Sequence, residues 1–437
     1  MYRKQYQILA SLAAIAFLIA LMLLISPTNA VMAEGPVGVD VVASNLDNPR
    51  GMTFGPDGGL YIAEAGRGGD APCFEGAEGQ ACYGATGAIT RVLNGQQERM
   101  AMGLPSLGGA EGNNATGPHD VAFDTNGTLH VIIGLGADPA VRETLGDVGG
   151  NFGQLASVSS SGELTNVADV AAFEGTNNPD GTQIDSNPFG VAAYSGGIAV
   201  TDAGANDLLH VMPTRSQSVL STTISTLTVF PTRTVEFPPT SGSQVPMQAV
   251  PTGVAEGPDG ALYIGELTGF PFPVGGARVY RFVSGEQPTI YADGFTNIID
   301  VAFDSAGNLY VLELAANSLL SGNTAGALIR VAPDGTRETI VAGSAADSSS
   351  REAIVGTTLV NPTGVVVGSD GMVYVSNNGR VAENGQVIRI DPNQGPTALT
   401  LNGLHSNQAP SGIPAGTWAL LGLTAMAGLL FLLRRKR

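Results

Sequence analysis

The sequence predicts an all-β fold, a six-bladed β-propeller, and three observations carry this prediction. One strand–turn–strand pattern recurs six times, further short strands follow each copy, and the apolar positions alternate with a period of two. The 60 Gly and 26 Pro residues among 437 argue against a helical protein, because both residue types weaken helix interiors.

Each copy of the pattern reads as an alternating strand, a turn rich in Asp, Asn and Gly, and a second strand of the Leu-Tyr-Val type. The first copy is NPRGMTFGPDGGLYIAE. Its Asp-Gly dipeptide supplies the positive φ that a tight hairpin turn needs. The copies begin at Asn48, Gly117, Asn187, Val250, Asn297 and Asn361.

A third strand is expected after every copy, and a fourth before the next one, as at 288–292 and 338–342. The third strands are expected at 88–92, 153–158, 208–212, 278–282, 327–331 and 386–390. The segment Val39–Ala43 resembles a fourth strand without a blade of its own. We therefore expect it to complete the last blade and close the ring, which removes exposed strand edges.

The two ends of the chain predict export and a membrane tether. Residues 1–33 contain a basic start and an apolar stretch at 8–25, typical of a signal peptide or an uncleaved N-terminal anchor. The propeller is expected over 37–404 and a stalk over 405–416. Residues 417–437 then read as a transmembrane tail with a terminal basic cluster. Because basic ends stay cytoplasmic, the body should lie outside, anchored to the cell membrane.

The charge balance excludes some classes of function. The formal net charge is −18, and no Lys occurs between Lys4 and Lys436. An acidic surface repels phosphate backbones, so nucleic-acid binding is not expected. A Lys nucleophile or Schiff base in the body is excluded as well.

The two cysteines, Cys73 and Cys82, lie in a Gly-rich stretch. Outside the cytoplasm such a pair is expected to form a disulfide. Two Cys without a nearby His do not make a zinc site.

The spacing between copies is uneven, so the additional residues must lie in loops. Many of these loops connect the second strand to the third or precede the first strand, and both junctions open on one face of a propeller. Loops gathered on one face indicate that this face carries the function. The long segments are 66–87, 134–150, 172–187, 230–251 and 268–277.

Several loop motifs go beyond a generic propeller. They include Asp47-Asn48-Pro49-Arg50-Gly51, Gly117-Pro118-His119-Asp120, Asn177-Asn178-Pro179-Asp180-Gly181 and the run 265–275. Together they resemble the ScyD/ScyE family of secreted bacterial propellers, with NHL/SMP-30-like repeats, over about residues 45–390. The resemblance implies an exported six-bladed propeller without an established activity.

A polar residue recurs at the end of the second strand. Four carboxylates and one amide occupy this position: Glu64, Asp202, Glu266, Glu313 and Asn377. Oxygen ligands of this kind suit Ca²⁺, so the set is a candidate metal site at the channel mouth. The alternative is structural, with each side chain capping the loop of its own blade.

The residues just before the first strand are also expected at the channel mouth. They are Arg50, His119, Phe189, Thr252, Ile299 and Thr363. His119 and Asp120 are the best general-base or ligand pair, and Asp300 is the other acid that replaces Gly at its position. A buried structural histidine is the alternative for His119.

These features favour a monomeric binding or scaffold module that takes a small molecule, glycan or protein at the channel face. The alternative is a metal-assisted hydrolase of the gluconolactonase/SMP-30 type. Against it, Asn48-Pro49-Arg50-Gly51 stands where those enzymes carry a metal-binding Glu. A quinoprotein dehydrogenase is disfavoured by the missing lysines. Fold alone does not choose between these functions.

Overall fold

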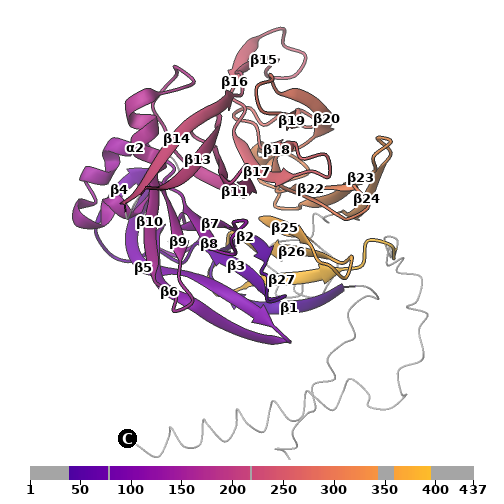
Figure 1. The fold of residues 1–437 in the computed structure, drawn as a ribbon. Helices are drawn as coiled ribbons and strands as arrows, with labels where there is room; N and C mark the ends of the chain where they lie inside the picture. The colour runs from indigo at the N-terminus through magenta and orange to yellow at the C-terminus, as the bar shows by residue number, and fades with distance from the viewer. Residues whose placement is uncertain (1–38, 77–78, 217–218, 343–358, 395–437) are drawn as a thin grey trace, which may run out of the picture. The chain divides into compact units, whose positions relative to one another are not determined.

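The computed structural model describes residues 39–76, 79–216, 219–342 and 359–394, and side chains 213–221 are not described. Six four-stranded antiparallel blades surround a central channel, which confirms the predicted propeller (Figure 1). Each inner strand contacts the inner strands of both neighbouring blades, and β25 of the last blade contacts β2 of the first, so the ring is closed.

The strands of each blade run outward in chain order, except in the last blade. The inner strands are β2 (Pro49–Phe54), β7 (Pro118–Phe123), β11 (Pro188–Tyr194), β17 (Pro251–Glu256), β21 (Ile298–Phe303) and β25 (Gly364–Val367). The second strands are β3 (Leu60–Glu64), β8 (Leu129–Ile133), β12 (Gly197–Asp202), β18 (Leu262–Glu266), β22 (Leu309–Glu313) and β26 (Val373–Asn377). The third strands are β5 (Gly79–Leu93), β9 (Gln154–Val158), β13 (Asp207–Ser216), β19 (Ala277–Phe282), β23 (Ala327–Val331) and β27 (Gly385–Ile390). The outer strands are β6 (Gln96–Gly108), β10 (Leu164–Asp169), β14 (Val219–Val229), β20 (Thr289–Phe295), β24 (Arg337–Ala342) and β1 (Val39–Leu46).

The N-terminal strand closes the ring as predicted. β1 pairs antiparallel with β27 from Val39 opposite Ile390 to Leu46 opposite Gly385. Figure 1 shows the indigo β1 lying along the yellow β27. The last blade is therefore built from both ends of the described chain, and β1 covers the edge of β27.

In four of the six copies a Tyr of the second strand bonds to an Asp of the hairpin turn. Tyr61 donates its hydroxyl to Asp57 Oδ2 at 3.0 Å, and Tyr374 does the same to Asp370 at 2.9 Å. His130 takes the place of the Tyr in the second copy, and its Nε2 lies 3.4 Å from Asp124 Oδ2. His130 therefore belongs to the turn and the packing between blades rather than to the channel.

The core lies between the faces of adjacent blades. The second strands β3, β8, β18 and β22 are buried at every position. Edge-to-face aromatic pairs join neighbouring blades, such as Tyr61 with Phe123, whose ring centroids are 5.0 Å apart. Phe54 and Tyr374 make the same contact between the first and last blades at 5.1 Å.

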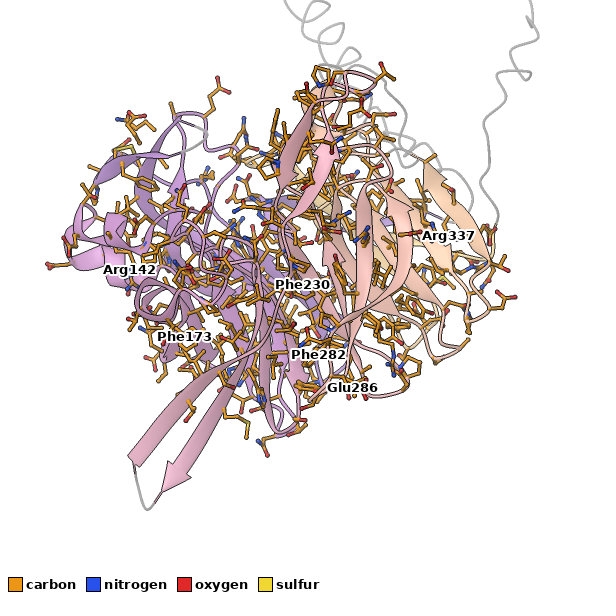
Figure 2. All side chains as sticks on the ribbon, turned by 90° about the horizontal axis from the view of Figure 1, so that it is seen from above. Arg142, Phe173, Phe230, Phe282, Glu286 and Arg337 are labelled. Atoms are coloured by element: carbon orange, nitrogen blue, oxygen red, sulfur yellow. A yellow bond between two sulfur atoms is a disulfide. The ribbon has the colours of Figure 1, made fainter. Side chains whose placement is uncertain are left out.

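The long loops carry additional elements. β4 (Cys73–Gly76) extends the sheet of the first blade by pairing with the long strand β5. Outside the blades lie the hairpin of β15 (Arg233–Glu236) and β16 (Gln244–Met247), α2 (Val170–Asn177), and the short 3-10 helices η1 (Pro139–Glu143), η2 (Gly146–Asn151) and η3 (Leu319–Ser321). The β13–β14 hairpin projects well beyond the body of the ring (Figure 2).

No helix among the described residues is long and apolar enough to cross a membrane. The apolar stretches at 8–25 and 417–433, on which the predicted signal and tail rest, lie outside the described residues.

Candidate functional site

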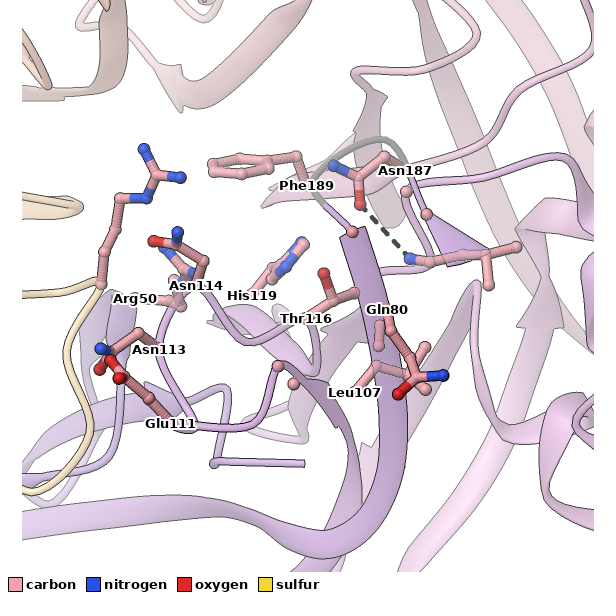
Figure 3. Close-up of a pocket in the computed structure, with 18 of the residues that line it drawn as sticks. Arg50, Gln80, Leu107, Glu111, Asn113, Asn114, Thr116, His119, Asn187 and Phe189 are labelled. Carbon is pink, nitrogen blue, oxygen red and sulfur yellow. Dashed lines mark hydrogen bonds between the residues drawn. The ribbon is translucent and has the colours of Figure 1, made fainter. Parts of the chain in front are cut away.

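A cavity of about 550 Å³ opens at the channel mouth, and all six blades contribute to its wall. Its apolar part includes Phe189, Leu267, Ile299 and Leu314. Figure 3 shows Arg50, His119 and Phe189 around one space, with Asn113 and Glu111 on the loop beside it. A cavity of this size suits a small organic molecule.

The cavity has a cationic lining although the protein is acidic. Arg50 and Arg380 line it together with a single acidic residue, Glu111. Arg50 is 8% exposed, and its Nη2 donates to the Ala115 carbonyl at 2.7 Å. Because neutral amides supply most of the remaining polar lining, the cavity should favour a ligand of negative charge.

Three residues next to the first position of an inner strand, expected from the sequence to lie just before the strand, share a structural role. Thr252 Oγ1 donates to the Ile298 carbonyl of the next blade at 2.8 Å, and Thr363 Oγ1 donates to the Pro49 carbonyl at 2.6 Å. His119 occupies the equivalent position in the second blade. Its Nδ1 lies 3.2 Å from the Pro188 carbonyl of the third blade, so it makes the same inter-blade bond.

That hydrogen bond determines which tautomer His119 adopts. A carbonyl only accepts, so Nδ1 carries the proton and Nε2 keeps a lone pair. Burial is the main cause and the nearby charge of Arg50 the second, and together they lower the pKa of His119 to about 3. His119 is therefore neutral at physiological pH, and its Nε2 is left as a hydrogen-bond acceptor.

Asp120 and Asp300 belong to the channel wall in the second and fifth blades. Asp120 accepts the backbone N–H of Val121 and, at 2.9 Å, that of Val191 in the next blade. Asp300 likewise accepts the N–H of Val301 and, at 2.8 Å, that of Val365.

Asp120 and Asp300 are both partly buried, and the surrounding strands screen their carboxylates from bulk water. Burial raises the pKa of Asp120 well above its usual range, and the charge of Asp300 adds to this. Burial also raises the pKa of Asp300 to about 7. The pair therefore carries less than two full negative charges near neutral pH.

The five polar residues at the ends of the second strands turn toward their own blades. None of them lines the cavity. Four accept a backbone N–H from the loop before the inner strand of the same blade: Glu64 from Asp47, Asp202 from Asn187, Glu313 from Thr296 and Asn377 from Val360, each at 2.7 Å. These are the bonds that the loop-capping alternative expects, and metal ligation by this set stays a prediction.

Glu266 differs from the other four because its hydrogen-bond donor is a side chain of an inserted hairpin and not a backbone N–H of the loop before the inner strand. It accepts from Arg233 at the start of the β15–β16 hairpin and is fully buried. Burial raises the pKa of Glu266 to about 6, while Arg233 opposes the shift. A residue from an insertion thus takes the place of the backbone donor.

The described residues contain no group of three His, Cys, Asp or Glu side chains close enough to hold a metal ion together. The candidate pair His119 and Asp120 is adjacent in the chain, and the two side chains bond to different parts of the third blade. The structure therefore brings Asp120 and Asp300 into electrostatic contact but leaves the five residues at the strand ends in separate blades.

The predicted disulfide is confirmed. Cys73 and Cys82 are bonded and lie opposite each other in the β4–β5 ladder. Phe74 and Gln80 of the same hairpin line the cavity. The disulfide therefore holds part of the cavity wall.

Sequence reasoning missed the cavity residues that come from loops. Arg380 follows β26, Asn114 lies before β7 and Leu314 follows β22, and none belongs to a repeated position that we singled out. The sequence indicated these residues only in that they lie in segments next to the predicted channel mouth.

Fold and cavity together define a class, a closed six-bladed propeller with a ligand-sized cavity at its channel mouth. The chain matches no protein-family model and no curated protein. Among solved structures, it is similar to a gluconolactonase from Xanthomonas campestris at 9% identity and a TM-score of 0.42, with 81% of this chain and 89% of that chain covered. It is also similar to a protein of unknown function from Bacteroides thetaiotaomicron at 9% identity and a TM-score of 0.49, with 80% and 75% covered. Likenesses this low say nothing about the activity of this chain.

Proposed function

We propose that the protein is an exported, membrane-tethered binding module of the ScyD/ScyE type that holds a small organic anion in the mouth cavity. One observation carries this proposal: two arginines and one glutamate line a cavity in a protein whose net charge is −18. An anion is repelled by an acidic surface and attracted to a cavity whose lining holds more arginines than acids.

The rest of the wall describes the other half of the ligand. Phe189, Ile299 and Leu314 offer apolar contact, while Asn113 and Asn114 offer amide hydrogen bonds. Ligand sites of this kind combine an apolar lining with a few polar groups that orient the ligand. An aromatic or alicyclic carboxylate combines the two required properties.

Export and tethering rest on the sequence. The apolar stretch 417–433 ends in a basic cluster, and the stretch 8–25 follows a basic start. The disulfide supports an oxidising compartment, since cytosolic thiols are kept reduced. We infer that the cavity lies on the extracytoplasmic side.

The test compares a charged probe with its neutral isostere on the full chain in lipid nanodiscs. Binding of 1-naphthylacetate and 1-naphthylacetamide is measured by titration calorimetry. We expect the carboxylate to bind at least about tenfold more tightly, because charge-assisted hydrogen bonds are worth about 1.5–3 kcal/mol. Arg380→Gln should remove most of this preference, whereas the surface control Arg91→Gln should keep it. Equal binding of the two probes, or no binding of either, contradicts the proposal.

A metal-assisted hydrolase is the second candidate, and the donors at the mouth fit it poorly. The four oxygens of Asp120 and Asp300 accept backbone N–H groups. The acids at the ends of the second strands turn away from the cavity. Hydrolysis of an aldonolactone by the full chain with added divalent cations, lost in Asp300→Asn, would favour the hydrolase over the binding module.

A further inference from the structure

The bond from His119 to the next blade does not explain why this position holds a histidine. Thr252 and Thr363 occupy the equivalent position in the fourth and sixth blades, and their hydroxyls donate to the first residue of the following inner strand. His119 makes the same bond from Nδ1 to Pro188, the first residue of β11. A threonine would therefore serve the frame of the ring equally well. What the histidine adds is its second ring nitrogen.

That nitrogen, Nε2, lies on the side of the ring that faces the cavity. A Cβ added to Gly134 would come within 2.2 Å of Cε1 and 2.5 Å of Nδ1, so the chain at Gly134 covers that edge of the imidazole. Nε2 and Cδ2 form the other side of the ring, and His119 lines the cavity. Figure 3 shows His119 among Asn114, Thr116 and Phe189, which line the same space.

Two contacts with β11 fix the orientation of the imidazole. Nδ1 lies 3.2 Å from the Pro188 carbonyl, and the ring of Phe189 packs on the imidazole with a centroid distance of 5.0 Å. The side chain is also only 4% exposed. Nε2 is thus held in one direction before a ligand arrives, and a preorganised group loses little conformational freedom on binding.

Nε2 can accept a hydrogen bond but cannot donate one. Because Nδ1 donates to a carbonyl, the lone pair of the neutral ring is on Nε2. No donor from the described residues reaches this atom, and it is not sealed off in the way that the unpartnered Nδ1 of His130 is. Burial and the charge of Arg50 hold the pKa of His119 at about 3, so protonation does not turn Nε2 into a donor near neutral pH.

We propose, on the basis of the anion binding proposed above, that the mouth cavity takes a hydroxylated carboxylate and that His119 selects it by accepting the hydroxyl hydrogen at Nε2. The carboxylate itself does not lie at Nε2, because two acceptors repel each other. It belongs with Arg50 and Arg380 in the same lining.

The hydroxyl group determines which of two similar anions binds. A ligand without it removes water from Nε2 and returns no hydrogen bond, so a buried acceptor is left unsatisfied. Sites built to bond a hydroxyl reject the analogue that lacks it for this reason. His119 is therefore a specificity-determining residue, whereas the arginines attract the negative charge.

The test extends the probe series on the full chain in lipid nanodiscs. Titration calorimetry compares 1-naphthylacetate with its monohydroxylated derivatives, on the α-carbon and on the rings, and with their methyl ethers. We expect at least one hydroxylated probe to bind about threefold to tenfold more tightly than the parent, and its methyl ether to lose that gain. His119→Thr keeps an inter-blade donor of the kind that Thr252 supplies. It should abolish the gain but still bind 1-naphthylacetate more tightly than the amide.

The control is Thr252→Val, which removes an inter-blade bond of the same kind at a residue that does not line the cavity. It should lower the melting temperature and keep the hydroxyl gain. Nitrogen NMR of the wild-type chain, labelled in its histidines, gives a readout other than affinity. The Nε2 resonance of His119 should move on addition of the selected hydroxylated probe and much less with its methyl ether.

The outcomes separate this inference from the proposed function. If 1-naphthylacetate is preferred over its amide but no hydroxylated derivative gains affinity, anion binding stands and the role of His119 is overturned. The same follows if His119→Thr keeps the gain, or if the free wild-type chain carries the His119 proton on Nε2. If the amide binds as tightly as the carboxylate, the proposed function fails and the hydroxylated carboxylate with it. The NMR experiment uses wild type alone, so it decides even where a variant does not fold.

Discussion

Replacing Arg233 with glutamine should destabilise the protein at high pH and much less at low pH. Arg233 donates from β15 to Glu266 and, at 2.9 Å, to the Gly276 carbonyl. Glu266 is fully buried, and its Oε2 has no hydrogen-bond partner among the described residues. Arg233 is thus the main source of positive charge for this carboxylate.

The pKa of Glu266 determines how large this pH-dependent loss of stability is. Burial raises it from 4.5 to about 6 even with Arg233 present. A folded-state pKa above the unfolded value means that ionised Glu266 opposes folding. The cost is absent below about pH 4.5, grows as the pH rises toward the folded pKa, and is constant above it. At 1.36 kcal/mol per pKa unit, the wild type carries about 2 kcal/mol of this cost above pH 6.

Without Arg233 the folded pKa rises further, so the cost keeps growing above pH 6. It cannot exceed the cost of keeping Glu266 protonated, which is about 3.4 kcal/mol at pH 7 and about 4.8 kcal/mol at pH 8. The additional penalty in Arg233→Gln is therefore at most about 1.4 kcal/mol at pH 7 and about 2.7 kcal/mol at pH 8. Near pH 5 it is close to zero, apart from the lost bond to Gly276.

Thermal unfolding at pH 5 and pH 8 checks this reasoning. At about 2 °C per kcal/mol, the melting temperature of Arg233→Gln should fall several degrees further below wild type at pH 8 than at pH 5. Glu266→Gln should remove the pH dependence and largely rescue the double variant. The surface control Arg91→Gln should change little, since exposed ion pairs contribute about 0–1 kcal/mol. An equal loss for Arg233→Gln at both pH values would refute the argument.

Three other perturbations test the frame of the ring. Deleting Val39–Leu46 uncovers the edge of β27, so the truncated chain should aggregate, and a monomer with an unchanged melting temperature in analytical ultracentrifugation and calorimetry would contradict this. Replacing Cys73 and Cys82 with alanine should cost at most about 2–3 kcal/mol for so short a loop, and hydrogen exchange should increase in 66–87 before it increases elsewhere. Gly51→Ala would place its Cβ against Asp120 Oδ1, so it should cost about 3 kcal/mol or more in denaturant titrations, and Asp120→Ala in the same chain should recover most of that loss.

The repeat predicted the blades because its signal is local. The alternation of apolar residues predicts a strand, and the Asp-Gly dipeptide predicts the hairpin turn. The third strand expected at 386–390 accordingly lies within one residue of the bounds of β27. The closing strand Val39–Ala43 was predicted for a similar reason, since one fourth strand lacked a blade. The disulfide followed from compartment and spacing alone.

The insertions could not be predicted because they occur once each. Nothing in the repeat announces that 233–236 and 244–247 form a hairpin, or that 170–177 forms a helix. Consequently the partner of Glu266 was invisible. Glu64 and Glu266 hold the same place in the pattern, yet Glu64 accepts the backbone N–H of Asp47 as well as the side chain of Arg99, whereas Glu266 accepts the side chain of Arg233 from the inserted hairpin.

The channel wall shows how ring closure couples residues that the linear sequence keeps apart. At one repeated position the six blades read Gly51, Asp120, Gly190, Gly253, Asp300 and Gly364. A Cβ at Gly51 would meet Asp120, and a Cβ at Gly253 would meet Asp300, so each Asp fills the space that a preceding glycine leaves open. Each Asp also bonds to the residue after the following glycine. The same Gly-Asp-Gly unit therefore occurs twice, in blades that face each other across the ring. The preceding glycine therefore cannot gain a Cβ while the Asp is present, whereas the following glycines are restricted by carbonyls of the next blade, Thr252 at Gly190 and Arg50 at Gly364.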